Sequence, residues 1–182
     1  MIFNYTFGLQ KINTENIKVN RREAVRGIIL YNDKILMVHS NKGDYKFPGG
    51  GVNIRESHEE ALAREIREET GYIMDEVVNK IGMVIQRNVD KYETDYIFEM
   101  TSHYYLCKVT DRQVSQQLDD YEKELDFCPM WINIDKAISS NEEILRNGED
   151  INSWVYRETK VLKALRDWYG ERSNVTDQNR GK

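Results

Sequence analysis

Runs of apolar residues separated by short polar segments predict a sheet of several strands. Two of these runs, 24–31 and 34–39, flank the dipeptide Asn32-Asp33. Two-residue turns of Asn or Asp join antiparallel strands, so we expect a hairpin at this point. The segment 110–127 is a strongly acidic connection. Further segments with the β-branched and aromatic content of strands are 76–87, 96–109 and 129–132.

The segment 57–71 has the local signals of a helix at both ends. Ser57 and Glu60 form a capping box, in which the serine side chain and the glutamate side chain each satisfy a backbone amide of the first turn. Gly71 can take the left-handed conformation that ends a helix. An apolar side suited to packing on a sheet is formed by Leu62, Ala63 and Ile66.

The rest of the chain fits one mixed α/β domain at 1–170. A short helix is expected near 135–139, and 153–169 has the periodicity of an amphipathic helix that packs on the sheet. Residues 1–20 contain short β-prone pieces and are expected to add a strand or hairpin as an N-terminal extension. The polar residues 171–182 are expected to be a disordered tail. No linker or repeat divides the chain, so we expect a mixed sheet between helical layers.

Composition limits the classes of function. The chain has 182 residues, a formal net charge of −5 and two cysteines. This charge argues against binding to a nucleic-acid polymer, because such binding needs a basic surface, but it permits a small phosphorylated substrate. Cys107 and Cys128 lack metal or redox spacing, so reduced, buried thiols are expected. No apolar run approaches the roughly 20 residues of a membrane span and no signal peptide is evident, so we expect a cytoplasmic protein.

The stretch from Gly50 to Tyr72 carries the strongest chemical signal. Glu65, Glu68 and Glu69 stand at i, i+3 and i+4, so they share one face of the predicted helix. Like charges this close repel each other, and a divalent cation would turn that repulsion into a binding site. A glycine-rich turn stands directly before this helix, where the backbone can approach a ligand or metal closely.

The order of residues in this stretch resembles the signature of the Nudix (MutT-like) hydrolases. That signature is G-x5-E-x7-R-E-U-x-E-E-x-G-U, where U is a bulky apolar residue. Gly50 and Glu56 match its first two fixed positions, and the segment from Arg64 to Gly71 matches the others. Tyr72 departs from the usual aliphatic residue, which we interpret as a conservative packing change. The resemblance implies a Nudix-like α/β/α sandwich.

The resemblance also implies a reaction, the cleavage by water of a diphosphate bond in a nucleoside diphosphate linked to another group. Glu65, Glu68 and Glu69 match the metal-binding glutamates of the family, and the carbonyl of Gly49 or Gly50 is a candidate for a further ligand. Oxygen ligands favour a hard ion, so Mg²⁺ is expected, with Mn²⁺ as a substitute. The implied partner is a small nucleoside diphosphate derivative, and the protein is expected to be a monomer or homodimer.

Supporting roles follow from the same resemblance. Glu56 and Arg64 match positions that orient the site through an ion pair. The general base is either Glu65 or a glutamate from a late loop, for which Glu122 and Glu124 are the candidates by position. Independently of the resemblance, Arg26 and Lys46 are cations near apolar elements that should approach the site, so both could contact the substrate phosphates. The backbone of Gly50, in the glycine turn, is a third candidate for such a contact.

Histidine is not expected to bind metal in this chain. His39, His58 and His103 show no ligand spacing along the sequence, although His58 stands close to the acidic helix face. We therefore expect structural or surface roles for all three, and zinc is not expected.

The substrate is not specified by the sequence. ADP-ribose hydrolases of this family often carry a proline downstream of the signature, where Gln86 and Arg87 stand here. Dinucleoside polyphosphate hydrolases often carry a tyrosine, where Asn88 and Val89 stand. Two other functions stay open. One is a non-catalytic nucleotide sensor, although the intact signature disfavours it; the other is a structural calcium site, although the Asp- and Gly-rich pattern of calcium loops is not seen.

Overall fold

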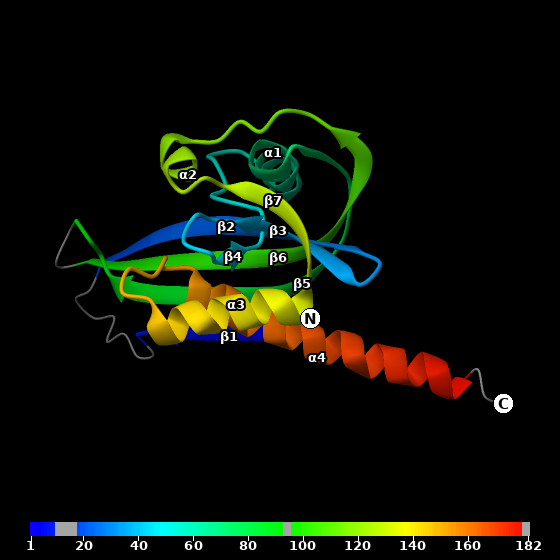
Figure 1. Cartoon of the computed structure of the whole chain (residues 1–182). Coiled ribbons are helices and arrows are strands. Elements are labelled where there is room, and N and C mark those ends of the chain that lie inside the picture. Colours follow the sequence, from blue (N-terminus) through cyan, green and yellow to red (C-terminus); the bar gives the residue numbers. More distant parts are fainter. Residues whose placement is uncertain (10–17, 93–95, 180–182) are drawn as a thin grey trace. The chain divides into compact units, whose positions relative to one another are not determined.

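A computed structural model of the chain describes residues 1–9, 18–92 and 96–179, with 171–179 described by their backbone alone. Within these residues the chain is a mixed α/β protein of seven strands and four helices (Figure 1). The elements group into two compact units. Unit 1 contains Phe3–Ile29 and Pro48–Leu118, and unit 2 contains Leu30–Phe47 and the residues from Asp119 onward.

Unit 1 is built on four strands in the order β1-β5-β6-β2. The two long strands β5 (Tyr72–Val89) and β6 (Tyr96–Gln113) pair antiparallel and lie side by side (Figure 1). Strand β2 (Lys18–Tyr31) pairs parallel with β6, and β1 (Phe3–Gly8) pairs parallel with β5. The strands predicted at 76–87 and 96–109 are therefore present and longer than expected, and β1 is the extra strand expected near the N-terminus.

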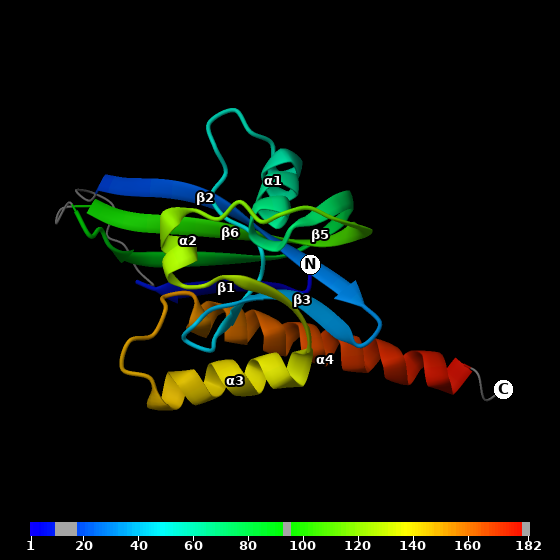
Figure 2. The ribbon, with the colours of Figure 1, turned by 45° about the horizontal axis from the view of Figure 1, so that its top comes forward.

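Helix α1 (His58–Thr70) covers the strands of unit 1 (Figure 2). Both predicted caps are confirmed: the Ser57 side chain accepts a hydrogen bond from the Glu60 amide, and Gly71 ends the helix with a φ of 74°. The apolar side of the helix packs on the sheet, where the Ile66 side chain meets strand β2 at Gly27. Because Gly27 has no side chain, the helix can lie close to the strand.

Unit 2 contains the predicted hairpin. The end of β2 pairs antiparallel with β3 (Lys34–His39), with Leu30 opposite Ile35. The turn residue Asn32 has a φ of 54°, the left-handed conformation that asparagine tolerates better than most residues. Strand β3 also pairs with β4 (Tyr45–Lys46) and with β7 (Cys128–Asn133), which includes the strand predicted at 129–132.

The helices of unit 2 differ from the expectation. Helix α2 (Asp120–Glu124) lies within the predicted acidic connection, and α3 (Ile134–Asn147) extends far beyond the short helix expected near 135–139. Helix α4 (Val155–Asn179) packs along α3 and continues into the segment expected to be a disordered tail, of which 180–182 lie outside the described residues (Figure 1). That segment contains no proline to stop the helix. Within the part of the chain that the structure describes, no helix is long and apolar enough to cross a membrane.

The two cysteines are in different environments. Cys107 is buried, and burial raises the pKa of its thiol to about 12. The expectation of buried thiols is wrong for Cys128, which is exposed because it stands at the first position of β7 with its side chain outward. Both thiols are free.

The contact between β1 and β5 generates a first prediction. A Cβ atom added at Gly82 would lie 2.2 Å from the ring of Phe3, which is itself buried against Tyr104. We expect Gly82→Ala to lower the free energy of unfolding by about 1–3 kcal/mol, the usual cost of overpacking. Urea unfolding measures this loss.

A double-mutant cycle tests the cause. In a Phe3→Leu background the same Gly82→Ala change should cost less, because the smaller side chain leaves room. The matched control is Gly170→Ala in helix α4, where an added Cβ meets nothing within 4 Å. Strict additivity of the two changes at Gly82 and Phe3 would contradict the proposed clash.

Candidate functional site

The glycine turn before α1 brings the backbone against the helix carboxylates. A Cβ atom at Gly50 would lie 2.4 Å from a carboxylate oxygen of Glu65, and one at Gly49, with its φ of 140°, would lie 2.1 Å from the carbonyl of Val25. The amide of Gly49 donates to Glu69 at 2.8 Å, and the carbonyl of Gly50 accepts from the Val25 amide at 2.9 Å. Only residues without side chains fit between β2 and the acidic face of α1.

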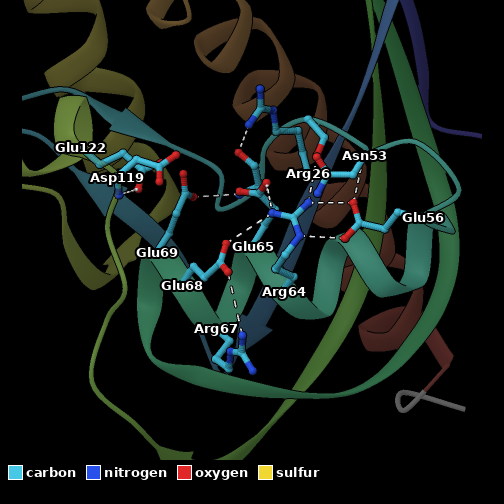
Figure 3. Close-up of polar contacts among 12 residues, drawn as sticks. Arg26, Asn53, Glu56, Arg64, Glu65, Arg67, Glu68, Glu69, Asp119 and Glu122 are labelled. Atoms are coloured by element: carbon cyan, nitrogen blue, oxygen red, sulfur yellow. Dashed lines mark hydrogen bonds and ion pairs between the residues drawn. The ribbon is translucent and has the colours of Figure 1, made fainter.

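The guanidinium group of Arg64 lies at the centre of the site (Figure 3). Its Nε and Nη2 atoms donate to the two carboxylate oxygens of Glu56 at 2.7 and 2.8 Å. Nη2 also donates to the carbonyl of Gly51 at 3.0 Å. Nη1 donates to Glu65 at 2.6 Å and to Glu68 at 3.3 Å. One side chain therefore connects the glycine turn, the loop before α1 and the acidic face of α1.

The ion pair expected between Glu56 and Arg64 is present. Its two parallel hydrogen bonds, together with the Asn53 amide, which donates at 2.8 Å, hold the pKa of Glu56 at about 2. The hydrogen bonds to Glu56 and Glu65 raise the pKa of Arg64. Two parallel bonds of this kind fix the orientation of both groups as well as their charge.

The three glutamates Glu65, Glu68 and Glu69, called the box glutamates below, are largely buried. Glu69 is 1% exposed and Glu65 is 9% exposed, whereas the side chain of Glu68 is 27% exposed. Arg67, in contrast, is exposed and makes a long ion pair of 3.9 Å with Glu68 (Figure 3). Buried carboxylates one turn apart need positive charge nearby, so their burial fits a cation-binding role.

The donor set of the box glutamates fits a hard divalent ion. These donors are carboxylate oxygens beside backbone carbonyls, which Mg²⁺ and Mn²⁺ prefer. The three carboxylates do not place three oxygens within 4.8 Å of one another. That spacing suits Mg²⁺, which is usually held by one or two carboxylates together with water and substrate phosphates.

Arg26 is bonded to the glycine turn. Its side chain is buried, its Nη1 atom donates to the carbonyl of Gly49, and within the described residues its Nε atom has no hydrogen-bond partner. Arg26 thus fixes the carbonyl that the sequence suggested as a metal ligand. Its contact with substrate phosphate stays a prediction.

Lys46 belongs to unit 2 and is also buried. Its ammonium group lies 4.7 Å from the ring centre of Phe127 and 5.9 Å from that of Trp154, both within range of a cation–π interaction. Trp154 in turn donates to Asp44 at 2.5 Å. The position of Lys46 is thus explained by aromatic packing, and its contact with a substrate stays a prediction.

The two loop glutamates lie on helix α2 of unit 2. Glu122 is buried, and its two oxygens accept hydrogen bonds from the Asp119 amide and the Tyr121 hydroxyl, each at 2.9 Å. Glu124 is exposed. Glu122 therefore caps its own helix, and a general-base role for either glutamate stays a prediction.

The structure brings together a second group that spacing along the chain does not reveal. Glu23, His58 and His103, called the histidine cluster below, place one ligand atom each within 4.8 Å of one another. In the parallel pair β2–β6, Val25 lies opposite His103, so their side chains share a face of the sheet. Glu23 stands two residues before Val25 and therefore lies on the same face. Predicting the cluster would require the register of the β2–β6 pair, and the sequence does not supply that register.

Comparison with known proteins shows similarity over most of the chain to one family. The model of the NUDIX domain matches residues 20–153. The chain is 48% identical to an ADP-ribose pyrophosphatase of Methanocaldococcus jannaschii over 54 residues, and these residues make up 28% of this chain and 32% of that protein. It is 52% identical to an RNA pyrophosphohydrolase of Ectopseudomonas mendocina over 48 residues, and these residues make up 25% of this chain and 30% of that protein. The chain thus matches about a third of the length of these curated relatives.

A solved structure confirms the predicted fold class. The chain is similar to a NUDIX hydrolase from Nitrosomonas europaea with a TM-score of 0.57, over 84% of this chain and 90% of that one. The sequences are 18% identical, so the likeness concerns the fold alone.

The Glu56–Arg64 pair generates a prediction for pH dependence. Since the pKa of Glu56 is about 2 in the folded protein and about 4.5 ordinarily, the stabilisation is complete above pH 4.5 and is lost as the pH falls toward 2. We expect Glu56→Gln to lower the free energy of unfolding at pH 7 by about 1.5–3 kcal/mol. Urea unfolding at a series of pH values should show the difference from the unmodified protein shrinking below pH 4.5.

The control is Glu59→Gln, an exposed glutamate of the first turn of α1. Its effect should stay within about 0.5 kcal/mol at every pH. A Glu56→Gln effect that does not change with pH would show that the stabilisation does not come from the ionised pair.

Proposed function

Because this chain belongs to the NUDIX family, we propose that it is a hydrolase that cleaves the diphosphate bond of a nucleoside diphosphate derivative, with Mg²⁺ as cofactor and Mn²⁺ as a substitute. The observation that supports this best is the row of buried carboxylates on α1, tied by Arg64 to a glycine turn. A buried anionic face closely packed against backbone carbonyls and amides is suited to a metal-bound phosphate, and an ordinary surface helix does not have one.

The proposed reaction is an attack of water on one phosphorus of the diphosphate. The bond from that phosphorus to the bridging oxygen breaks, the leaving phosphate keeps the electron pair, and a carboxylate takes the proton of the water. The box glutamates would hold the metal, which when bound neutralises phosphate charge and lowers the pKa of the attacking water. Glu56 and Arg64 hold Glu65 and Glu68 in place, and Gly49 does the same for Glu69 through its amide.

Three carboxylates are candidates for the base. Glu65 accepts a hydrogen bond from Arg64 at 2.6 Å. Glu122 already accepts two hydrogen bonds as a helix cap, whereas Glu124 is exposed. We propose Glu124 as the first of the loop glutamates to test, since a change there leaves the cap of α2 intact.

For the substrate we propose a small nucleoside diphosphate derivative. The curated relatives are named for ADP-ribose and for RNA, so both kinds of substrate belong in a test panel. The formal net charge of −5 favours the small molecule over a polymer. We also propose that residues 1–170 act as one domain in the cytoplasm, as a monomer or homodimer; the family match across 20–153 supports the single domain.

The alternative is a nucleotide-binding sensor without catalysis. A panel of nucleoside triphosphates, ADP-ribose, nucleotide sugars, dinucleoside polyphosphates and 5′-triphosphorylated RNA with Mg²⁺ or Mn²⁺ discriminates the two. Release of phosphate, diphosphate or nucleoside monophosphate from any member supports the hydrolase. Binding without turnover on every member would favour the sensor.

The metal assignment generates a prediction. Glu68→Gln and Glu69→Gln keep the shape of the side chains and remove one charge each, so each should lower Mg²⁺-dependent kcat by at least about 100-fold on an active substrate. Far-UV circular dichroism should show an unchanged fold. The control is Glu76→Gln on β5, where the glutamate is exposed and pairs with Lys108 at the surface. A near-normal rate in both box variants would refute the metal assignment.

The proposal that Glu124 is the general base generates a further prediction. Glu124→Gln should lower kcat by about 10²–10⁴-fold with little change in the Mg²⁺ concentration for half-maximal rate, as expected for loss of a general base. Glu122→Ala should instead lower the free energy of unfolding by about 0.5–2 kcal/mol, as loss of a cap does. Full activity of the Glu124 variant would return the role to Glu65 or Glu122.

A further inference from the structure

The histidine cluster lies in unit 1 and takes no part in the proposed reaction. Glu23 comes from β2, His103 from β6, and His58 is the first residue of α1. In the sequence signature the position of His58 is variable, so the metal chemistry of the box glutamates does not account for it. Three different elements thus contribute one metal-ligating side chain each to the same place.

Two distances in the cluster are close to those between ligand atoms around a bound transition metal. His58 Nε2 lies 3.3 Å from one oxygen of Glu23, and His103 Nε2 lies 3.6 Å from the other. The ring centres of His58 and His103 are 4.6 Å apart. Ligand atoms that bind a tetrahedral zinc ion at about 2.0–2.1 Å lie about 3.3 Å from each other. Small adjustments would therefore bring all three atoms to coordination distance.

A buried nitrogen in the cluster points to a ligand. His103 is 7% exposed, and within the described residues its Nε2 atom has no hydrogen-bond partner. The nearest carboxylate oxygen, on Glu23, lies 3.6 Å from this nitrogen, which is beyond hydrogen-bond distance and leaves room for an ion between them. Buried polar atoms in folded proteins are nearly always satisfied, so this loose contact needs an explanation.

The surroundings of His58 fit a metal ligand. Its Nδ1 atom lies 2.6 Å from the hydroxyl of Tyr105. Its Nε2 atom lies 3.3 Å from Glu23, within hydrogen-bond distance, and that bond requires the proton on Nε2. Metal binding requires the other tautomer, which donates from Nδ1 to the Tyr105 hydroxyl and has its lone pair on Nε2. Metal-binding histidines commonly have such an outer partner, which fixes the tautomer and the ring orientation.

Lys80 of β5 opposes metal binding in the arrangement described. Its ammonium group lies 2.7 Å from Nδ1 of His103, and donation to that atom leaves the proton of a neutral ring on Nε2. Coordination through Nε2 requires Lys80 to turn away so that Nδ1 takes the proton. Lys80 is exposed, so this movement is into solvent.

We propose that Glu23, His58 and His103 form a second metal site, separate from the box glutamates, for a transition-metal ion of the zinc class. Two imidazole nitrogens and one carboxylate suit Zn²⁺ and Co²⁺ far better than Mg²⁺, and a water would complete four-coordination. The ion connects the first residue of α1 to β2 and β6 and thereby stabilises unit 1. It does so next to the glycine turn, because the Glu23 carbonyl accepts a hydrogen bond from the Val52 amide.

Metal binding to the full chain tests the proposal. The untagged protein is stripped with a chelator and titrated with Zn²⁺ against a chromophoric competitor, and with Co²⁺ by visible absorption. We expect one equivalent, the spectrum of four-coordinate Co²⁺ with nitrogen and oxygen ligands, and a metal-dependent rise in Tm. The variants Glu23→Gln, His58→Gln and His103→Gln should each weaken binding by at least about 100-fold, and Tyr105→Phe by about 10-fold.

Matched variants separate this site from others. Lys80→Met should tighten binding, because it removes the group that competes for the His103 ring. Cys128→Ser should leave binding unchanged and controls for an accidental site, since exposed Cys128 stands opposite His39 on β3. Glu69→Gln should also leave the Co²⁺ spectrum unchanged, so the result does not depend on the proposed hydrolase activity.

The outcomes are decisive in each direction. Circular dichroism of the metal-free variants establishes that they fold, so a loss of binding can be assigned to the lost ligand. The proposal is overturned by an absence of stoichiometric Zn²⁺ binding in both the unmodified protein and Lys80→Met. It is equally overturned if binding survives in the three ligand variants or disappears in Cys128→Ser.

Discussion

The arrangement of the candidate active site depends on the side chain of Arg64. Its five donors reach Glu56, Glu65, Glu68 and the carbonyl of Gly51, so one guanidinium group sets the positions of the loop, the helix face and the glycine turn together. Lysine could supply the charge but not these directions, because its ammonium group lacks the planar fork. The low pKa of Glu56 results mainly from the hydrogen bond that it accepts from Arg64.

The burial of two of the box glutamates explains why this network suits a cation. Glu65 and Glu69 are held among backbone groups with almost no access to water, where unpaired negative charge is costly. The Gly49 amide and Arg64 offset part of that cost. A bound divalent ion would offset much more, and substrate phosphates would bring the ion to carboxylates that do not converge on a single point. This arrangement supports the proposal that metal and substrate bind together.

Features that depend on neighbours in sequence could be predicted, and features that depend on distant strands could not. The caps of α1 at Ser57 and Gly71 and the Asn32 turn follow from local backbone rules, and all are present. Helix α2 was missed although a capping glutamate stands at Glu122, because a helix of five residues gives no periodic signal and forms only with tertiary support.

The site residues also divide into those that local sequence predicts and those that depend on distant strands. The sequence placed Glu65, Glu68 and Glu69 on one face, which needs only helix geometry. It did not show that Glu65 and Glu69 are buried, because that depends on how closely the glycine turn packs on the helix. The histidine cluster was invisible for a further reason: its members come from β2, α1 and β6, and their meeting depends on strand register.

Helix α1 contributes residues to both the box glutamates and the histidine cluster, and the different chemistry of the two groups would keep the two proposed ions apart. His58 is the first residue of the helix and Glu69 is one residue from its end, so they are about 16 Å apart along the axis at 1.5 Å per residue. Oxygen donors at one end favour a hard ion, whereas nitrogen donors at the other favour zinc. Because a helix is a rigid connection, an ion that fixes its start also limits the motion of the carboxylates at its end. Occupancy of the histidine cluster would then act on catalysis through the position of α1, without exchange of metal between the two sites.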